Sequence, residues 1–230
     1  MKWKPREHFY IPDTQCRNGV ALDHLTAAGN YIVDHKPDVI IHAGDHWDMP
    51  SLSEYDRGKK CFEGRRYNDD IQAGLEGMEA LLRPLWEYNA RRARLKEKQY
   101  KPRMVFTTGN HENRIERAIE VEPRLEGTLG LHHLQLDKFG WEVYPFLQPV
   151  EIDGVWYAHY FYNPMTGKPY GGKAHTRLNN IGFSFTMGHQ QGKDTAEKHL
   201  ANGQILRALI AGSFYQHDED YKGPQGNAHW

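Results

Sequence analysis

Five short polar stretches carry the residues whose types and spacing could do chemistry. In chain order they are Asp13-Thr14-Gln15, Gly44-Asp45-His46-Trp47-Asp48, Gly109-Asn110-His111-Glu112, Tyr157-Ala158-His159-Tyr160 and Gly188-His189-Gln190-Gln191. Carboxylate, amide and imidazole groups are ligands that divalent cations accept. Singly, each stretch is a weak signal, because Gly-Asp and Gly-Asn pairs are ordinary turn residues. Their joint occurrence makes a metal-dependent site the leading hypothesis.

Short apolar runs precede the first three stretches, as expected of buried strands that end in ligand-bearing loops. These runs are residues 8–11, 39–41 and 104–106. A second series is rich in β-forming residues and more closely spaced, which predicts a second sheet with mixed or antiparallel pairing. It comprises residues 141–144, 155–159, 183–187 and 205–210.

Helices are predicted between the early strands. Residues 21–35 form one of them, and a second is indicated by apolar residues at helical spacing: Ile71, Leu75, Met78, Leu82 and Leu85. Pro84 is expected to kink or split this second helix. Residues 51–54 have the spacing of a capping box, which predicts a short helix directly after the loop at 44–50.

In this order, the five stretches resemble the signature blocks of the calcineurin-like metallophosphoesterases, which read D-x-H, GDxxD, GNH[ED], a lone His and GHxH. The resemblance extends from Asp13 to Gln191. It implies an α/β fold of the four-layer αββα sandwich type, with two mixed β-sheets flanked by helices. We expect one domain over residues 1–230, with a helical basic insertion at about 51–103.

The resemblance also implies a site for two divalent ions, which would be Mn, Co, Ni or Zn, with Mg also acceptable. In the family pattern Asp45 bridges the two ions. The second ion would be bound by Asp45, Asn110, His159 and His189. The first would be bound by Asp13, Asp45, Gln15 and Gln191. His111 would be the catalytic imidazole, and Asp48 would orient it through a hydrogen bond.

The chain departs from the family pattern at Gln15 and Gln191, where the motifs have histidine. Both departures fall on ligands of the first ion. A glutamine can still coordinate through its carbonyl oxygen, which is a harder and weaker donor than imidazole. The first site is therefore expected to prefer Mn²⁺ or Mg²⁺ and to bind more weakly than the second. Alternatively, His46 or His42 supplies a missing imidazole, although His42 fits a strand core better and His46 a loop facing substrate.

The wider strings at 44–66 and 109–118 resemble the calcineurin-like phosphoesterases of bacteriophages. The implied activity is phosphodiester hydrolysis by a two-metal-activated hydroxide, with some phosphomonoesterase activity. Nucleotides and the ends of DNA or RNA are the implied substrates. The implied location is the cytoplasm, and the host cytoplasm if the protein is encoded by a phage. Arg114 is either a phosphate-binding residue or a surface residue. Two alternatives stay open: a phosphomonoesterase acting on nucleotides or phosphoproteins, and a non-catalytic metal-binding protein with the same fold.

Composition limits the partners. A net charge of −1 and a pI near 6.9 exclude a general basic field, so contact with a polyanion needs a local patch. The basic residues at 83–103 are either such a patch or the solvated face of a helix. Tyr157, Tyr160, Phe161 and Tyr162 either stack on a base or pack within the sheet.

Cysteine usage and hydropathy limit the class of protein further. The two cysteines, Cys16 and Cys61, have no CxxC spacing, which argues against a cysteine-ligated zinc site and fits a reducing cytoplasm. No apolar run approaches the length of a membrane span, so we expect no membrane partner. The sequence ends at Trp230 without a helix stop, and the natural chain could extend further.

Overall fold

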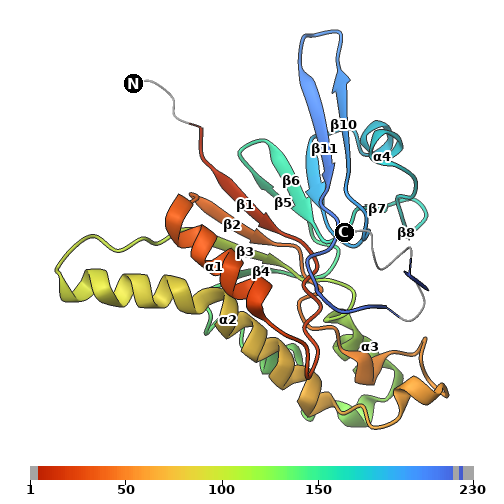
Figure 1. The fold of residues 1–230 in the computed structure, drawn as a ribbon. Helices are drawn as coiled ribbons and strands as arrows, with labels where there is room; N and C mark the ends of the chain where they lie inside the picture. Colours follow the sequence, from red (N-terminus) through yellow and green to blue (C-terminus); the bar gives the residue numbers. More distant parts are fainter. Residues whose placement is uncertain (1–4, 220–222, 225–230) are drawn as a thin grey trace.

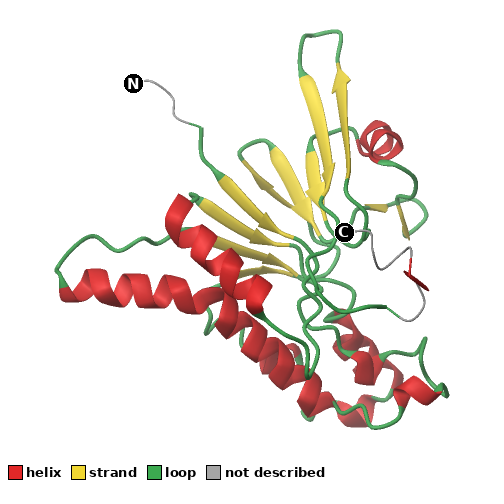
Figure 2. Ribbon diagram, viewed as in Figure 1, coloured by secondary structure: helices red, strands yellow, loops and turns green. Residues whose placement is uncertain are grey.

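The computed structural model describes residues 5–219 and 223–224. Four of its strands form a sheet in the order β1-β2-β3-β4, and every neighbouring pair is parallel (Figures 1 and 2). Their bounds are β1 His8–Ile11, β2 Val39–His42, β3 Arg103–Thr107 and β4 Glu142–Tyr144. All four residues of the central strand β2 are buried, as expected for a parallel strand that is covered on both faces.

A second sheet has mixed pairing, as predicted. Its order is β10-β11-β9-β6-β5; β9 is parallel to both neighbours, whereas β5 and β10 pair in the antiparallel sense. The bounds are β5 Val150–Ile152, β6 Val155–Ala158, β9 Phe185–Met187, β10 Asp194–His199 and β11 Ile205–Ile210. A small hairpin, β7 Tyr162–Asn163 and β8 Lys168–Pro169, lies beside it.

The α-helices lie on the outer faces of these sheets or in the connections. They are α1 Asp23–His35, α2 Tyr67–Arg94, α3 Asn113–Val121 and α4 Ala174–Ile181. Single 3-10 turns occur at Pro50–Leu52, Lys60–Phe62, Pro123–Leu125 and Leu131–Leu134. Among the described residues, no helix combines the length and apolar character that a membrane crossing requires.

Alternate residues of β2 show how the layers pack. Ile40 belongs to the cluster that α1 and α2 form with the first sheet. Its neighbours Val39 and Ile41 belong to a second cluster, which lies between the two sheets and also contains Val105, Val150, Ile152 and Tyr157. On the second sheet, Leu178 of α4 packs with Phe185 of β9. These packed sheets and helices confirm the α/β class.

Two expectations about the sheets are wrong. Residues 141–144 were expected in the second sheet, but β4 pairs with β3 in the first. The first sheet is also not mixed, since each of its pairs is parallel. The segment between β3 and β4 contains α3 and two 3-10 turns, which is long enough for the crossover that a parallel edge strand needs. Strand propensity alone does not identify the pairing partner.

α2 is 28 residues long and continues through Pro84, so of the two expected outcomes, a kink or a split, the split does not occur. Figure 1 shows α2 changing direction along its length, which agrees with a kink. α1 crosses α2 at this point. A Cβ atom on Gly29 of α1 would lie 2.2 Å from the Leu81 carbonyl oxygen and 3.0 Å from Cγ of Pro84. The absence of a side chain at Gly29 therefore allows the two helices to approach closely.

The short helix expected directly after the 44–50 loop is present as a 3-10 turn, Pro50–Leu52, but the expected capping box is wrong. No side-chain hydrogen bond caps this turn, which has Pro50 at its start. The Ser51 backbone N–H donates to Oδ2 of Asp70 over 2.9 Å. The Ser51 hydroxyl is buried and has no hydrogen-bond partner among the described residues. The first residue of this turn needs no hydrogen-bonding cap, because proline has no backbone N–H group.

We predict that Gly29→Ala lowers the free energy of unfolding by about 1–3 kcal/mol, because the added methyl group overpacks the helix crossing. The control is Asn30→Ala at the next, exposed position of α1, which should change stability by less than about 0.5 kcal/mol. Urea denaturation of the two variants measures the difference. Equal midpoints for both would contradict the close approach.

Candidate functional site

The five polar stretches occupy loops that follow β1, β2, β3, β6 and β9. Each of these strands has a parallel neighbour, so the loops gather at the carboxyl ends of the two sheets, near the middle of Figure 1. Backbone hydrogen bonds join them directly. The Gln15 N–H donates to the Asp45 carbonyl over 2.9 Å, and the Gly188 N–H donates to the His159 carbonyl over 3.1 Å. Residues far apart in sequence are thereby held in one site.

Asp45, His159 and His189 form a group that could hold a metal ion. One ligand atom from each lies within 4.8 Å of the others. Oδ1 of Asn110 lies 2.8 Å from Nε2 of His159, which adds a fourth oxygen or nitrogen donor. We call these four residues the donor group. They are the residues that the motifs assigned to the second ion.

A backbone carbonyl group orients the His159 ring. Its Nδ1 atom lies 2.9 Å from the Ala43 carbonyl oxygen, which can only accept, so Nδ1 carries the proton. In the neutral ring this leaves the lone pair on Nε2, which faces Oδ2 of Asp45 at 3.3 Å. A backbone partner that fixes the tautomer in this way is typical of histidine ligands.

Buried acidic groups around the donor group favour a cation. Burial opposes the charged form of His159, but the carboxylates of Asp45, Asp13 and Glu112 together outweigh it and raise the His159 pKa to about 9. Burial raises the Asp13 pKa to about 7, against the attraction of His159 and with the repulsion of Asp45. Burial, followed by the charge of His159, lowers the His189 pKa to about 4. A divalent ion would stabilise both carboxylates here and bind neutral imidazole at His189.

The loop after β1 brings two more oxygen acceptors to this region. Oδ1 of Asp13 accepts the His189 backbone N–H over 2.9 Å. Oδ2 of Asp13 and Oε1 of Gln15 are buried, and neither has a hydrogen-bond partner among the described residues. Buried oxygens of this kind cost free energy unless a cation or water satisfies them. Their chemistry fits the ion expected at the first site.

Gln191 remains outside the donor group. It is partly exposed in the loop after β9, and its backbone carbonyl accepts from the Ser213 hydroxyl over 3.4 Å. Its predicted role as a ligand of the first ion stays a prediction.

The predicted pairing of His111 with Asp48 is present. Nδ1 of His111 lies 3.0 Å from Oδ1 of Asp48, and the His111 backbone N–H donates to Oδ1 of Asp45 over 2.8 Å. Nε2 of His111 lies 3.7 Å from Oδ2 of Asp45. The ring is therefore oriented by one carboxylate and placed beside another that belongs to the donor group.

Arg114 lies against this pair. Its Nη1 donates to the carbonyl oxygens of Asp48 and Met49 over 2.7 and 3.1 Å. Its Nη2 lies 3.0 Å from Nε2 of His111. Because a guanidinium group can only donate, this contact requires a lone pair on Nε2, and the His111 proton then lies on Nδ1, facing Asp48. Arg114 is thus part of the site's periphery rather than a solvated residue of α3.

Arg17 and Glu219 extend the network and were not anticipated from the sequence. Nε of Arg17 donates to Oδ2 of Asp48, the carboxylate that holds His111. Nη2 of Arg17 contacts both carboxylate oxygens of Glu219 at 2.8 and 2.9 Å. No local pattern marks these residues, because 202 positions of sequence separate Arg17 from Glu219.

Glu112 organises the loops and was also missed as a separate functional residue. Its side chain is fully buried and accepts four backbone N–H groups. The donors are Asp45 at 2.9 Å, His46 at 2.6 Å, Trp47 at 3.0 Å and Gly109 at 2.9 Å. Burial raises the Glu112 pKa, and the Asp45 charge adds to this effect, whereas the N–H donors oppose it. The carboxylate joins the loop after β2 to the loop after β3.

The loops are packed so closely that some backbone positions are unusual. A Cβ atom on Gly109 would lie 2.1 Å from Oδ1 of Asp45, so only glycine fits there. Gln15, Asp45 and His189 have positive φ angles of 37°, 47° and 64°. Left-handed conformations of non-glycine residues concentrate at functional sites, where surrounding contacts hold them.

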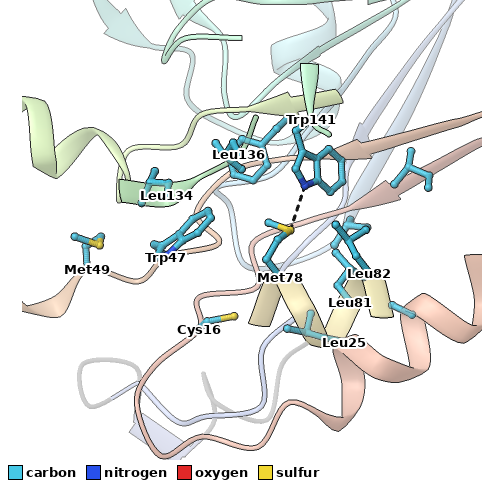
Figure 3. Packing of buried hydrophobic residues seen from close by; sticks show 14 of the residues in the cluster. Cys16, Leu25, Trp47, Met49, Met78, Leu81, Leu82, Leu134, Leu136 and Trp141 are labelled. Atoms are coloured by element: carbon cyan, nitrogen blue, oxygen red, sulfur yellow. Dashed lines mark hydrogen bonds between the residues drawn. The ribbon is translucent and has the colours of Figure 1, made fainter. Parts of the chain in front are cut away.

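Apolar side chains anchor the same loops to the core. Figure 3 shows Cys16, Trp47 and Met49 in the cluster that also contains Met78 and Trp141. The Trp47 indole N–H donates to the Ile71 carbonyl of α2 over 3.1 Å. α2 thus packs against the site loops on their core side, although it lies within the segment that was predicted as an insertion.

His46 does not face a substrate, and the predicted substrate-binding role is wrong. Its side chain is fully buried. Nδ1 lies 2.7 Å from the Thr14 hydroxyl and Nε2 lies 2.9 Å from the Gly74 carbonyl oxygen, so both ring nitrogens are used inside the protein. His42 is buried in β2, as expected, and stacks on Phe106. Neither histidine belongs to the donor group.

The basic residues at the end of α2 lie far from this site. Gly77 contacts the site loops, since a Cβ atom there would lie 2.4 Å from Sγ of Cys16. At about 1.5 Å per residue, Arg94 lies about 25 Å further along the helix axis. Arg91 and Arg94 are exposed. The solvated helix face is the interpretation that this placement favours.

Comparison with known proteins adds little. No family model matches the chain, and no curated protein matches it. A solved structure is similar over 92% of this chain and 92% of its own length, at 12% sequence identity and a TM-score of 0.35.

We predict that Glu112→Gln lowers the free energy of unfolding by about 2–4 kcal/mol, since an amide N–H₂ group would face backbone N–H donors without an acceptor. The melting temperature should fall by roughly 5–10 °C. Glu116→Gln, at an exposed position of α3, is the matched control and should melt like the parent protein. Differential scanning calorimetry compares the three, and a parental melting temperature for Glu112→Gln would refute the organising role.

For the donor group, we predict that His159→Ala weakens Mn²⁺ binding at least tenfold, because one nitrogen donor is removed. His199→Ala, at an exposed position of β10, should leave the affinity unchanged. Isothermal titration after chelation measures both. Equal Mn²⁺ affinities of His159→Ala and the parent protein would show that His159 is not a metal ligand.

Proposed function

We propose that this protein is a metal-dependent phosphoesterase that hydrolyses phosphodiesters, with some activity on phosphomonoesters. One observation carries the proposal: the donor group and the His111–Asp48 pair meet at a shared residue, Asp45. Oδ2 of Asp45 is 3.3 Å from Nε2 of His159 and 3.7 Å from Nε2 of His111. A cation bound by the donor group would therefore lie beside an oriented imidazole.

The residues present fit two divalent ions, of which the first is bound more weakly. The donor group offers two oxygen and two imidazole donors, whereas the loop after β1 offers the unpaired oxygens of Asp13 and Gln15. When bound, such ions activate a water for attack on phosphorus and neutralise the charge on the phosphoryl oxygens. Mn, Co, Ni and Zn suit this mixed set, and Mg is acceptable at the oxygen-rich first site.

His111 and Arg114 are proposed to act on the phosphate itself. In the neutral ring, Nε2 of His111 accepts a hydrogen bond from Arg114. A phosphate oxygen that displaces this contact would bind Arg114 and free Nε2 to carry a proton. Burial disfavours the charged ring, but Asp45 and Asp48 outweigh it and raise the His111 pKa. His111 could therefore donate a proton to the leaving oxygen, while Asp48 holds its orientation.

The finer fold assignment is part of this proposal. α1 and α2 pack on one face of the first sheet, and the second sheet packs on the other. α4 packs on the far face of the second sheet. This succession supports a four-layer αββα sandwich of the metallophosphoesterase type.

The first test is hydrolysis of bis(p-nitrophenyl) phosphate against p-nitrophenyl phosphate, after chelation and return of Mn²⁺, Co²⁺, Ni²⁺, Zn²⁺ or Mg²⁺ singly. Diester turnover that depends on one of these ions supports the proposal. Preference for the monoester would favour a phosphomonoesterase. Ion binding without any turnover would favour a non-catalytic metal-binding protein.

We predict that His111→Ala lowers kcat about 10²- to 10⁴-fold, as expected for loss of a general acid. Metal content should not change, because His111 is outside the donor group. His175→Ala, at an exposed position of α4, is the control for a histidine deletion and should retain full activity. Elemental analysis and steady-state kinetics on the same preparations separate the two effects. Retained turnover in His111→Ala would end the catalytic assignment.

A further inference from the structure

An apolar cavity of about 330 Å³ adjoins the donor group. No charged residue lines it, and most of its wall is aromatic. The lining residues are Leu147, Pro149, Tyr160, Phe161, Tyr162, Pro164, Tyr170, Ile181 and Phe183. Small-molecule sites in proteins are typically concave, largely apolar and of this size.

Tyr160 connects the cavity to the candidate metal centre. Its ring centroid lies 4.8 Å from that of His189 and 5.7 Å from that of His159. The same ring lines the cavity. A group bound there would be separated from two of the donor residues by a single aromatic side chain, which is within the dimensions of one substrate molecule.

A second cavity reaches the site through other residues. It has a volume of about 420 Å³ and includes Asp48, His111 and Arg114, together with Arg17, Lys59 and Arg65. The two cavities have no lining residue in common. Carboxylates that line the second cavity pair with Arg17, Lys59 and Arg65, whereas the Arg114 guanidinium contacts two backbone carbonyls and His111. The donor group is thus adjoined by a charged cavity that contains Arg114 and by an uncharged aromatic one. A substrate that fits both has an anionic part and an aromatic part.

We propose that the aromatic cavity binds the base of a nucleotidyl phosphodiester. This inference rests on the proposed function and specifies its substrate class: a phosphodiester that carries a nucleobase on the side of Tyr160. A free nucleotide ester and a nucleic acid end share this chemistry. The anionic remainder lies toward the cavity that contains Arg114.

The aromatic residues divide into packing and binding positions. Tyr157 lies between the sheets with 4% of its surface exposed, and Phe161 is buried at 6%. Tyr162 is 38% exposed, although it lines an apolar cavity. Packing therefore accounts for the first two but leaves Tyr162 accessible to a ligand. Stacking on such rings is strong and tolerates any base, because every base has a π-face.

The backbone at the cavity wall is also unusual. Leu147 has a φ angle of 67°, a conformation that leucine rarely adopts. Left-handed non-glycine residues of this kind gather at ligand sites as well as at catalytic ones.

Two diesters with the same leaving group test the inference: thymidine 5′-(p-nitrophenyl phosphate) and methyl p-nitrophenyl phosphate. The parent protein should prefer the thymidine ester in kcat/KM. In Tyr162→Ala this preference should fall about tenfold, which is a typical loss for one stacked base. The quantity compared between proteins is the ratio of the two kcat/KM values. In this comparison the difference in intrinsic reactivity of the two esters cancels, because it is the same for every protein.

Two variants serve as controls. Tyr162→Phe keeps the ring and should keep the preference. Tyr31→Ala removes a tyrosine of similar exposure, 44%, from α1 and should also keep it. An unchanged preference in Tyr162→Ala, with turnover of the methyl ester intact, would overturn the inference while the proposed function stands.

A binding measurement separates the two proposals if no diester is turned over. Thymidine 5′-phosphate and methyl phosphate are titrated into the metal-loaded protein by calorimetry. Tighter binding of the nucleotide, weakened about tenfold by Tyr162→Ala and not by Tyr31→Ala, supports the base site without the activity. Equal binding of both phosphates would overturn the base site.

Discussion

The candidate site depends above all on one buried carboxylate. Glu112 accepts backbone N–H groups from Asp45, His46, Trp47 and Gly109, and so fixes the relative position of two loops from neighbouring strands. The side chains of Asp45 and Asp48 project from one of these loops, and those of Asn110 and His111 from the other. Their distances to one another are set by backbone hydrogen bonds rather than by the functional groups themselves. Such a site is formed before any ligand arrives, which is the condition for strong electrostatic effects on a bound anion.

The electrostatic character of the site follows from what is buried there. Asp13, Asp45 and Asp48 are each at most 2% exposed. Arg17 compensates Asp48, whereas Asp13 and Asp45 are balanced mainly by imidazole. Histidine gives up its proton to a metal readily, and an arginine does not. The site is therefore able to exchange protons for a cation at Asp13 and Asp45, while the ion pair at Asp48 remains.

The sequence was sufficient to identify the residues of the donor group and the His111–Asp48 pair, because each of them lies in a short motif after an apolar run. The sequence was also sufficient to predict α1 and the first three strands of the parallel sheet, β1, β2 and β3. It could not place β4, since strand propensity carries no information about the partner strand. His46 was misplaced because a loop histidine next to Asp45 reads as accessible, although its two ring nitrogens are bound by Thr14 and Gly74. Arg17 and Glu219 meet only through the tertiary fold.

The donor group draws one ligand from each of four loops, and those loops belong to two different sheets. Asp45 and His189 are separated by most of the chain, so bringing them together closes a long loop and costs conformational entropy. Each sheet contributes only two of the four residues of the donor group. Ion affinity is consequently a measure of whether the two sheets have docked. A chain in which only one sheet has formed would not present the complete donor group. The ion would therefore stabilise the docked sheets after they have assembled and would not initiate their assembly.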